Sequence, residues 1–274
     1  MTNKFLKSII VVGSLVFLAS CSDKEDTMLE DQPAETLYSS GMDLLLKQKY
    51  HDAAKAFDEV DRQHPYSKWA AKAQLMTGFA YYQEQKYDLA IASFETFVQL
   101  HPGHPDAAYA HYMLGMCYYE QILKVDRDQD TTLYAQNAFQ DLLKKFPDST
   151  YARDAKYKLE LVRDHLAGKE MTNGRLYLSR NAYLAAIIRF KYVVEHFQTT
   201  SHVPEALHRL VECYTALGLN DEAQAAAAVL GHNYPGSPWY ADTYYLLEGK
   251  DLRPDESKTE RSWLNRFLGK RLKG

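Results

Sequence analysis

Residues 71–102 read AKAQLMTGFAYYQEQKYDLAIASFETFVQLHP, and this stretch decides the fold because its pattern recurs along the chain. Four of its residues have counterparts of the same type 37 residues earlier: Gly78, Ala90, Phe94 and Pro102 repeat Gly41, Ala53, Phe57 and Pro65. Gly115 and Tyr118 continue the register beyond Gly78 and Tyr81. A fixed period of this length, with small residues, aromatic residues and a closing proline, is typical of an array of helical repeats.

Each repeat is expected to form a pair of antiparallel amphipathic helices. The Gly and the Ala would let the two backbones approach closely, the Phe would fill the remaining gap, and the Pro would end the second helix. This pattern resembles the tetratricopeptide repeat, in a 37-residue version. One pair cannot bury its apolar face alone, so the pairs must stack. The sequence predicts an all-α fold, a superhelical array of about five such helix pairs.

The first twenty residues have the pattern of a lipoprotein signal peptide. Lys4 and Lys7 precede an apolar run, Ile9 to Ala19, that is too short to cross a bilayer as a stable helix. The run ends Leu18-Ala19-Ser20-Cys21, which resembles a bacterial lipobox, so Cys21 is predicted to carry the lipid anchor. In such lipoproteins an Asp after the cysteine marks the inner membrane, so Ser22 favours the outer membrane. An ordinary secretory signal with a chance cysteine is the alternative.

The remaining chain divides by composition and repeat phase. We expect a signal peptide over 1–20, a lipidated flexible tether over 21–33, repeats one to three over 34–150, repeats four and five over 151–247, and a C-terminal extension over 248–274. About eight residues are inserted in repeat three around 124–130, and repeat four is expected to open with a long helix from about Tyr151 to Ser179.

The last fifteen residues have the pattern of a basic amphipathic helix. Trp263, Leu264, Phe267, Leu268 and Leu272 recur at helical spacing, and 260–274 holds five basic residues and one acidic residue. A frayed tail is the alternative.

No motif for catalysis, a cofactor or a metal is found, and the protein is expected not to be an enzyme. Asp126, Asp128 and Asp130 alternate as at the start of a calcium loop, but Thr131 and Asn137 replace the Gly and Glu that such a loop requires. Without residues 1–20 the chain has 30 basic and 36 acidic residues, a formal charge of −6, which disfavours nucleic acid as a partner. Cys117 and Cys213 fall in different repeats and are expected to be buried free thiols.

The concave face of a tetratricopeptide array is lined by set positions of each first helix. Those positions predict an aromatic groove in the front repeats, formed by Tyr38, Met42, Leu75, Phe79, Tyr82, Tyr112 and Tyr119. The same positions are polar in repeat five. Exposed apolar surface of this kind usually binds a ligand. The alternative is that the rings only pack against one another or against the tether.

Several features together resemble the repeat-containing lipoproteins of the outer-membrane β-barrel assembly machinery. They are the lipobox, the three-plus-two repeats, the inserted Val125-Asp126-Arg127-Asp128, Phe146-Pro147-Asp148-Ser149-x-Tyr151, and Asp164-His165-Leu166-Ala167. The resemblance covers roughly 18–245. A pilotin-type lipoprotein that guides a secretin is the alternative.

The resemblance implies a scaffold anchored by its lipid on the periplasmic face of the outer membrane. Its C-terminal repeats would bind the barrel-forming assembly subunit and the accessory lipoproteins, and its N-terminal repeats would receive the last strand of unfolded outer-membrane proteins, which ends in an aromatic residue. Candidate docking residues in the rear repeats are Arg180, Glu205, His208, Arg209 and Glu212.

Overall fold

The computed structural model describes residues 31–248, which form eleven α-helices and no strand. The predicted signal peptide, Cys21, most of the tether and residues 249–274 lie outside the described residues. The helices are α2 (Ala34–Leu46), α3 (Tyr50–Gln63), α4 (Ala70–Gln83), α5 (Tyr87–Leu100), α6 (Ala107–Glu120), α7 (Asp130–Lys145), α8 (Ala152–Ser179), α9 (Tyr183–His196), α10 (Val203–Ala216), α11 (Asn220–Asn233) and α12 (Pro238–Glu248).

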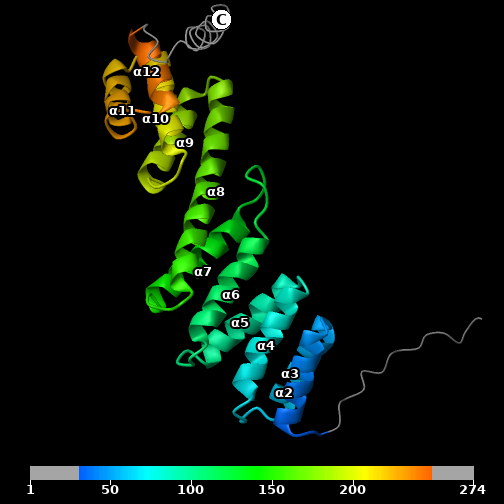
Figure 1. Cartoon of the computed structure of the whole chain (residues 1–274). Coiled ribbons are helices and arrows are strands. Elements are labelled where there is room, and N and C mark those ends of the chain that lie inside the picture. The colour runs from blue at the N-terminus through cyan, green and yellow to red at the C-terminus, as the bar shows by residue number, and fades with distance from the viewer. Residues whose placement is uncertain (1–30, 249–274) are drawn as a thin grey trace, which may run out of the picture.

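Successive helices pack on one another in an elongated stack, which confirms the predicted all-α array (Figure 1). The pairs are α2 with α3, α4 with α5, α6 with α7, α8 with α9, and α10 with α11, and α12 covers the last pair. Four of the five pairs are joined by three-residue turns whose middle residue has positive φ, at Gln48, Gln85, Asn181 and Gly218. The first two and the last two of these residues are again 37 apart, so the repeat register includes the turns.

A glycine on the first helix faces a phenylalanine on the second helix in four of the pairs. Phe57, Phe94, Phe139 and Phe190 are fully buried, with 0% exposure. A Cβ built on the opposing Gly41, Gly78, Gly115 or Gly174 would lie only 2.4–2.8 Å from the nearest ring carbon. Real Cβ atoms do not approach a ring that closely. The phenylalanine ring therefore fits only because the opposing residue is glycine, which has no side chain. The expected interior positions of Phe57 and Phe94 are confirmed.

The fifth pair reverses this arrangement. In the 37-residue register, Gly174 corresponds to Val211 and Phe190 corresponds to Ala227. Val211 is fully buried on α10, while Ala227 is half-buried on α11. The larger side chain has therefore moved from the second helix to the first, and the total volume between the two helices changes less than either substitution alone would suggest.

Helix α8 is twice as long as the standard 14-residue helix of the array, as its continuous apolar stripe predicts. The loop 121–129, which contains the insertion, packs beside its middle. Lys169 Nζ on α8 donates hydrogen bonds to the carbonyl oxygens of Asp126 and Arg127, at 3.1 and 3.0 Å. Gly168 leaves room for Val125, whose Cγ1 lies 3.4 Å from where a Cβ would stand. The inserted residues thus pack against the middle of α8, near Gly168 and Lys169.

Both described cysteines, Cys117 and Cys213, are free and buried, as expected. None of the described helices combines the length and apolar character that crossing a membrane requires.

Candidate peptide groove and docking surface

The seven predicted groove residues lie on the first helices of the front repeats. Tyr38 and Met42 are on α2, Leu75, Phe79 and Tyr82 are on α4, and Tyr112 and Tyr119 are on α6. Six of them are half-buried, whereas Leu75 is only 6% exposed and lies beneath the surface. Tyr82 and Tyr112 each contribute to two neighbouring core clusters. These side chains therefore line the seams between successive repeats and present only part of their surface to solvent.

Tyr112 is the most strongly fixed member of this row. Its hydroxyl donates a 2.7 Å hydrogen bond to Asp154 Oδ2 on α8, and its ring stacks on Tyr151 with centroids 5.3 Å apart. Burial raises the pKa of Tyr82 to about 12 and also raises that of Tyr112. These hydroxyls stay protonated at neutral pH and remain able to donate hydrogen bonds.

A positive charge stands at the α8 end of the row. Lys158 Nζ lies 4.4 Å from the centroid of the Tyr119 ring, a cation–π contact. The ring of Tyr119 also meets that of buried Phe139, at 6.4 Å. The seam between α6 and α8 thus combines aromatic surface with a half-buried ammonium group.

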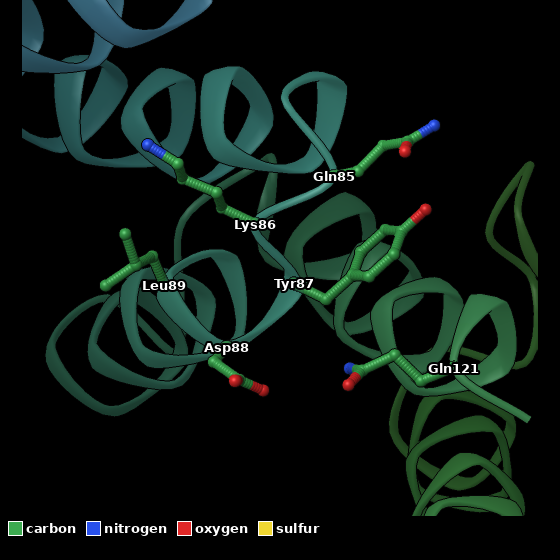
Figure 2. Close-up of a pocket in the computed structure, with 6 residues that line it drawn as sticks. All are labelled: Gln85, Lys86, Tyr87, Asp88, Leu89 and Gln121. Carbon is green, nitrogen blue, oxygen red and sulfur yellow. The ribbon is translucent and has the colours of Figure 1, made fainter.

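A hollow of about 250 Å³ adjoins the row at the turn between α4 and α5. It is lined by Gln85, Lys86, Tyr87, Asp88, Leu89 and Gln121, and in Figure 2 the Tyr87 side chain lies between those of Gln85 and Gln121. The Tyr87 ring meets Tyr82 edge-on at 5.8 Å, so the hollow and the aromatic row share a wall.

In the rear block, three of the predicted docking residues take part in one charged network. Glu205 accepts two 2.8 Å hydrogen bonds from Arg175 Nη1 and contacts Arg209 Nε at 3.5 Å. Arg209 Nη1 donates a 2.8 Å hydrogen bond to Glu212. Arg180, at the C-terminal end of α8, is exposed and stands outside this network. The network ties α8 to α10, and Arg180 remains available to a partner.

His208 attaches α12 and is not part of the surface. It is 5% exposed, its Nδ1 lies 2.8 Å from Thr243 Oγ1, and its ring meets that of Trp239 at 5.3 Å. Although burial raises the pKa of Glu212, hydrogen bonds from His208 and Arg209 hold that pKa below its usual value. Helix α12, which follows repeat five, therefore covers His208, whose side chain would be exposed on the concave face of an isolated repeat.

Sequence reasoning missed Arg175, although the signal was present. The residue after the repeat glycine is a concave position, occupied by Met42, Phe79 and Met116 in the front repeats. Arg175 directly follows Gly174 and occupies the same position in repeat four. Asp154, Lys158 and Trp239 carry no comparable signal, because each reaches the site from the helix two further along the chain, α8 for α6 and α12 for α10.

Within residues 31–248, no group of three or more His, Cys, Asp or Glu side chains could hold a metal ion. Stacked helix pairs with an aromatic seam and a charged rear face define a scaffold of the helical-repeat class.

Comparisons with known proteins identify the family. Residues 30–230 match the family model YfiO, described as outer membrane lipoprotein. The chain is 45% identical to the outer membrane protein assembly factor BamD of Caulobacter vibrioides over 97% of this chain and 88% of that protein. It is 42% identical to the outer membrane protein assembly factor BamD of Rickettsia prowazekii, over 90% of this chain and 97% of that protein. The chain belongs to this family of outer-membrane lipoproteins.

Among solved structures, the match to the P58(IPK) TPR domain covers 78% of this protein and 56% of the chain in that structure, at 15% identity and a TM-score of 0.42. At that score the likeness adds nothing to the helix pairs described above.

Proposed function

We propose that the protein is a lipid-anchored scaffold for the assembly of outer-membrane β-barrel proteins. It holds client peptides in the seam of its front repeats and docks the barrel-forming assembly subunit and accessory lipoproteins on its rear repeats. Its anchor is an acylated Cys21 on the periplasmic face. The assembly role is preferred to the pilotin role because relatives that match most of the chain are named assembly factors.

The observation that carries the client site is the row of half-buried rings on α4 and α6, which ends at a lysine. Aromatic ring pairs add roughly 0.5–1.5 kcal/mol beyond the area they bury, so Phe79 and Tyr119 suit a client that ends in an aromatic residue. The Tyr112 hydroxyl donates its single proton to Asp154, so its oxygen can accept a hydrogen bond from a backbone N–H of an extended peptide. We infer that Lys158 binds the terminal carboxylate of such a peptide, because its ammonium lies 4.4 Å from the centroid of the Tyr119 ring, beside the aromatic row.

A titration with a synthetic peptide from the last strand of a barrel protein tests this site. Changing the terminal Phe of the peptide to Ala should weaken binding by at least about 2- to 13-fold, the ratio that the ring-pair contribution of 0.5–1.5 kcal/mol gives before the lost apolar area is counted. Phe79→Ala should weaken binding of the intact peptide and barely change binding of the altered one. Tyr66→Ala is the matched control, because Tyr66 is fully exposed on a loop. Equal binding of both peptides would show that the rings are purely structural.

The same titration addresses Lys158. Amidating the terminal carboxylate should weaken binding to the wild type but not to Lys158→Gln. If amidation affects both proteins equally, the carboxylate is recognised elsewhere.

The rear site rests on Arg180, the exposed member of the predicted docking set. Charges at the edge of an interface mainly affect association rate and register, so Arg180→Glu should slow capture of the barrel subunit's periplasmic domain most strongly at low salt. Arg153→Glu makes the same charge change on an exposed residue at the other end of α8. Identical association rates for the two variants would place the docking surface away from the α8 terminus.

A further inference from the structure

The α3–α4 loop and the first turn of α4 carry exposed basic and aromatic side chains at the front end of the array (Figure 1). Tyr66 is fully exposed, and the ring centroid of half-buried Trp69 lies 4.8 Å from that of Tyr38 on α2. Lys68 Nζ and Lys72 Nζ lie 5.3 and 5.9 Å from the centroid of the Trp69 ring, so both ammonium groups stand beside the indole. The front patch consists of Tyr66, Lys68, Trp69 and Lys72.

The two lysines of the front patch lack acidic partners. Within residues 31–248, neither ammonium group forms an ion pair with a carboxylate. Two acidic residues of the neighbouring α3 are engaged elsewhere. Glu59 accepts a 2.8 Å hydrogen bond from Arg62 Nε, and Asp58 accepts a 2.9 Å hydrogen bond from Thr77 Oγ1. The two positive charges are therefore free to meet an anionic partner.

The junctions between repeats show which residues the fold itself requires. Each described junction, from a second helix to the next first helix, contains one hydrogen bond from a backbone N–H to the carbonyl three residues earlier, and this bond aligns the five junctions. The donors are Ser67, His104, Ser149, Thr200 and Ser237.

In that alignment, the exposed residues of the front patch are peculiar to the first junction. The position of Lys72 holds no other basic residue and is occupied by Tyr109, Asp154, Glu205 and Asp242. The position of Tyr66 is occupied by Gly103, Asp148, Thr199 and Gly236, and that of Lys68 by Pro105, Thr150, Ser201 and Pro238. Because four junctions form without an exposed ring or a lysine at these places, packing does not explain the front patch.

The front patch lies beside the point where the predicted tether enters the fold. Gln32 N donates a 3.0 Å hydrogen bond to Gln63 Oε1, and His64 Nε2 lies 2.6 Å from Gln32 O, so residue 32 is held at the start of the α3–α4 loop. Eleven residues lead from Cys21 to Gln32, and they span at most roughly 36–40 Å. A lipid on Cys21 would keep this loop near the bilayer, whereas the α11–α12 junction lies at the other end of the stack (Figure 1).

A phospholipid surface matches the chemistry of the front patch. Trp and Tyr side chains favour the headgroup region, because each has an apolar ring and a polar edge. Lysine can lay its apolar stem along the surface while its ammonium group meets a phosphate, and anionic lipids attract it further.

We propose that the front patch lies on the anionic phospholipid surface to which the chain is anchored, with Tyr66 and Trp69 among the headgroups and Lys68 and Lys72 on the phosphates. This second attachment holds the first repeat against the membrane and gives the array a fixed orientation there. The proposal rests on the Cys21 anchor proposed above.

Fluorescence quenching tests the contact on the lipoprotein reconstituted in vesicles that contain phosphatidylglycerol. An environment-sensitive fluorophore on Ser67→Cys should be quenched by nitroxide-labelled headgroups. Ser237→Cys is the matched control at the last junction, because both serines are half-buried and accept a 3.3 Å hydrogen bond from a tryptophan N–H. Native Cys117 and Cys213 are buried, and an acylated Cys21 has no free thiol, so only the new cysteine should be labelled.

A triple variant separates the front patch from the tether. Tyr66→Asp with Lys68→Thr and Lys72→Asp introduces the residues that the junction between α7 and α8 already carries, so the fold should tolerate them. Each lysine beside an anionic bilayer contributes a factor of about five, so the ratio of membrane-bound to free loop should fall by about 30-fold or more. Binding of the client peptide without membranes should be unchanged, because these residues lie outside the aromatic row.

Each other outcome has a definite meaning. Undiminished quenching in the triple variant would overturn the proposal, because the tether alone would then account for the proximity of the loop. Equal quenching at positions 67 and 237, or equal quenching at position 67 in purely zwitterionic phosphatidylcholine vesicles, would also overturn it. Protein that does not sediment with the vesicles would refute the Cys21 anchor and this proposal together, whereas sedimenting protein without quenching at position 67 would refute the front patch alone.

Discussion

Replacing Phe94 with alanine should destabilise the front repeats strongly. The ring is fully buried against Gly78, and burying a phenylalanine removes roughly 150–250 Å² from water. At ~25 cal/mol per Å² this corresponds to about 4–6 kcal/mol, and large-to-small core substitutions of this kind cost about 3–5 kcal/mol. For a chain of this size, 3–5 kcal/mol lowers the melting temperature by about 6–20 °C. Stacked repeats share interfaces, so the loss should extend to the neighbouring pairs.

The reversed fifth pair suggests a second experiment, which asks whether a larger residue on the first helix can replace the ring lost from the second helix. Gly78→Val alone should destabilise, because even a Cβ at that position would lie 2.8 Å from the Phe94 ring. Combined with Phe94→Ala, the valine enters the space left by the ring, as in Val211 and Ala227. The double variant should therefore recover about 1–2 kcal/mol relative to Phe94→Ala alone.

Thermal and guanidinium unfolding followed by circular dichroism would measure all three variants. Leu100→Ala is the control, since Leu100 is 64% exposed and should change the free energy of unfolding by less than about 0.5 kcal/mol. If the Phe94→Ala and Leu100→Ala proteins had the same melting temperature, the proposed stabilising contact between Gly78 and the Phe94 ring would be refuted. If the double variant lost as much free energy of unfolding as the two single variants together, Val211 would not compensate for the ring that Ala227 lacks in the fifth pair.

Three other outcomes can be checked independently. Cys21→Ala should release the protein from membranes when its partners are absent, and an intact mass showing an unmodified Cys21 in the wild type would contradict the anchor. Glu212 has a lowered pKa, so its contribution to stability is present above its ordinary value of 4.5 and is lost as pH falls through the lowered value. Hydrogen-exchange protection in α12, measured relative to the intrinsic exchange rate at each pH, should fall on acidification, and much less so in Glu212→Gln. Burial raises the pKa of Cys117 to about 12 and that of Cys213 to about 11, so iodoacetamide at pH 8 should label both only on unfolding, and rapid labelling of the folded protein would contradict their burial.

The features that the sequence predicted well are those contained within one repeat. The 37-residue period depends on Gly78 and Phe94 meeting inside a single pair, so local spacing was sufficient to place them. The long α8 was predictable for the same reason, because its apolar stripe is continuous in sequence.

The accessibility of individual side chains was less predictable, because it depends on the neighbouring element. His208 occupies a concave position of its own helix, but Trp239 and Thr243 of α12 cover it. Leu75 is likewise at a groove position and is buried in the cluster that α4 forms with α5 and α6. A consensus position describes where a side chain points from its helix and does not describe what the next helix brings against it.

The 28-residue α8 also sets the rotational phase between the front and rear halves of the array. Each helical residue advances the chain by 1.5 Å and turns it by about 100°, so the helix spans about 42 Å. Deleting one residue from its middle would turn the rear repeats by more than a quarter of a revolution relative to the aromatic seam. Deleting four would come close to restoring their heading while shortening the distance by about 6 Å. The helix therefore fixes both the distance and the direction in which the two ends of the scaffold present their surfaces.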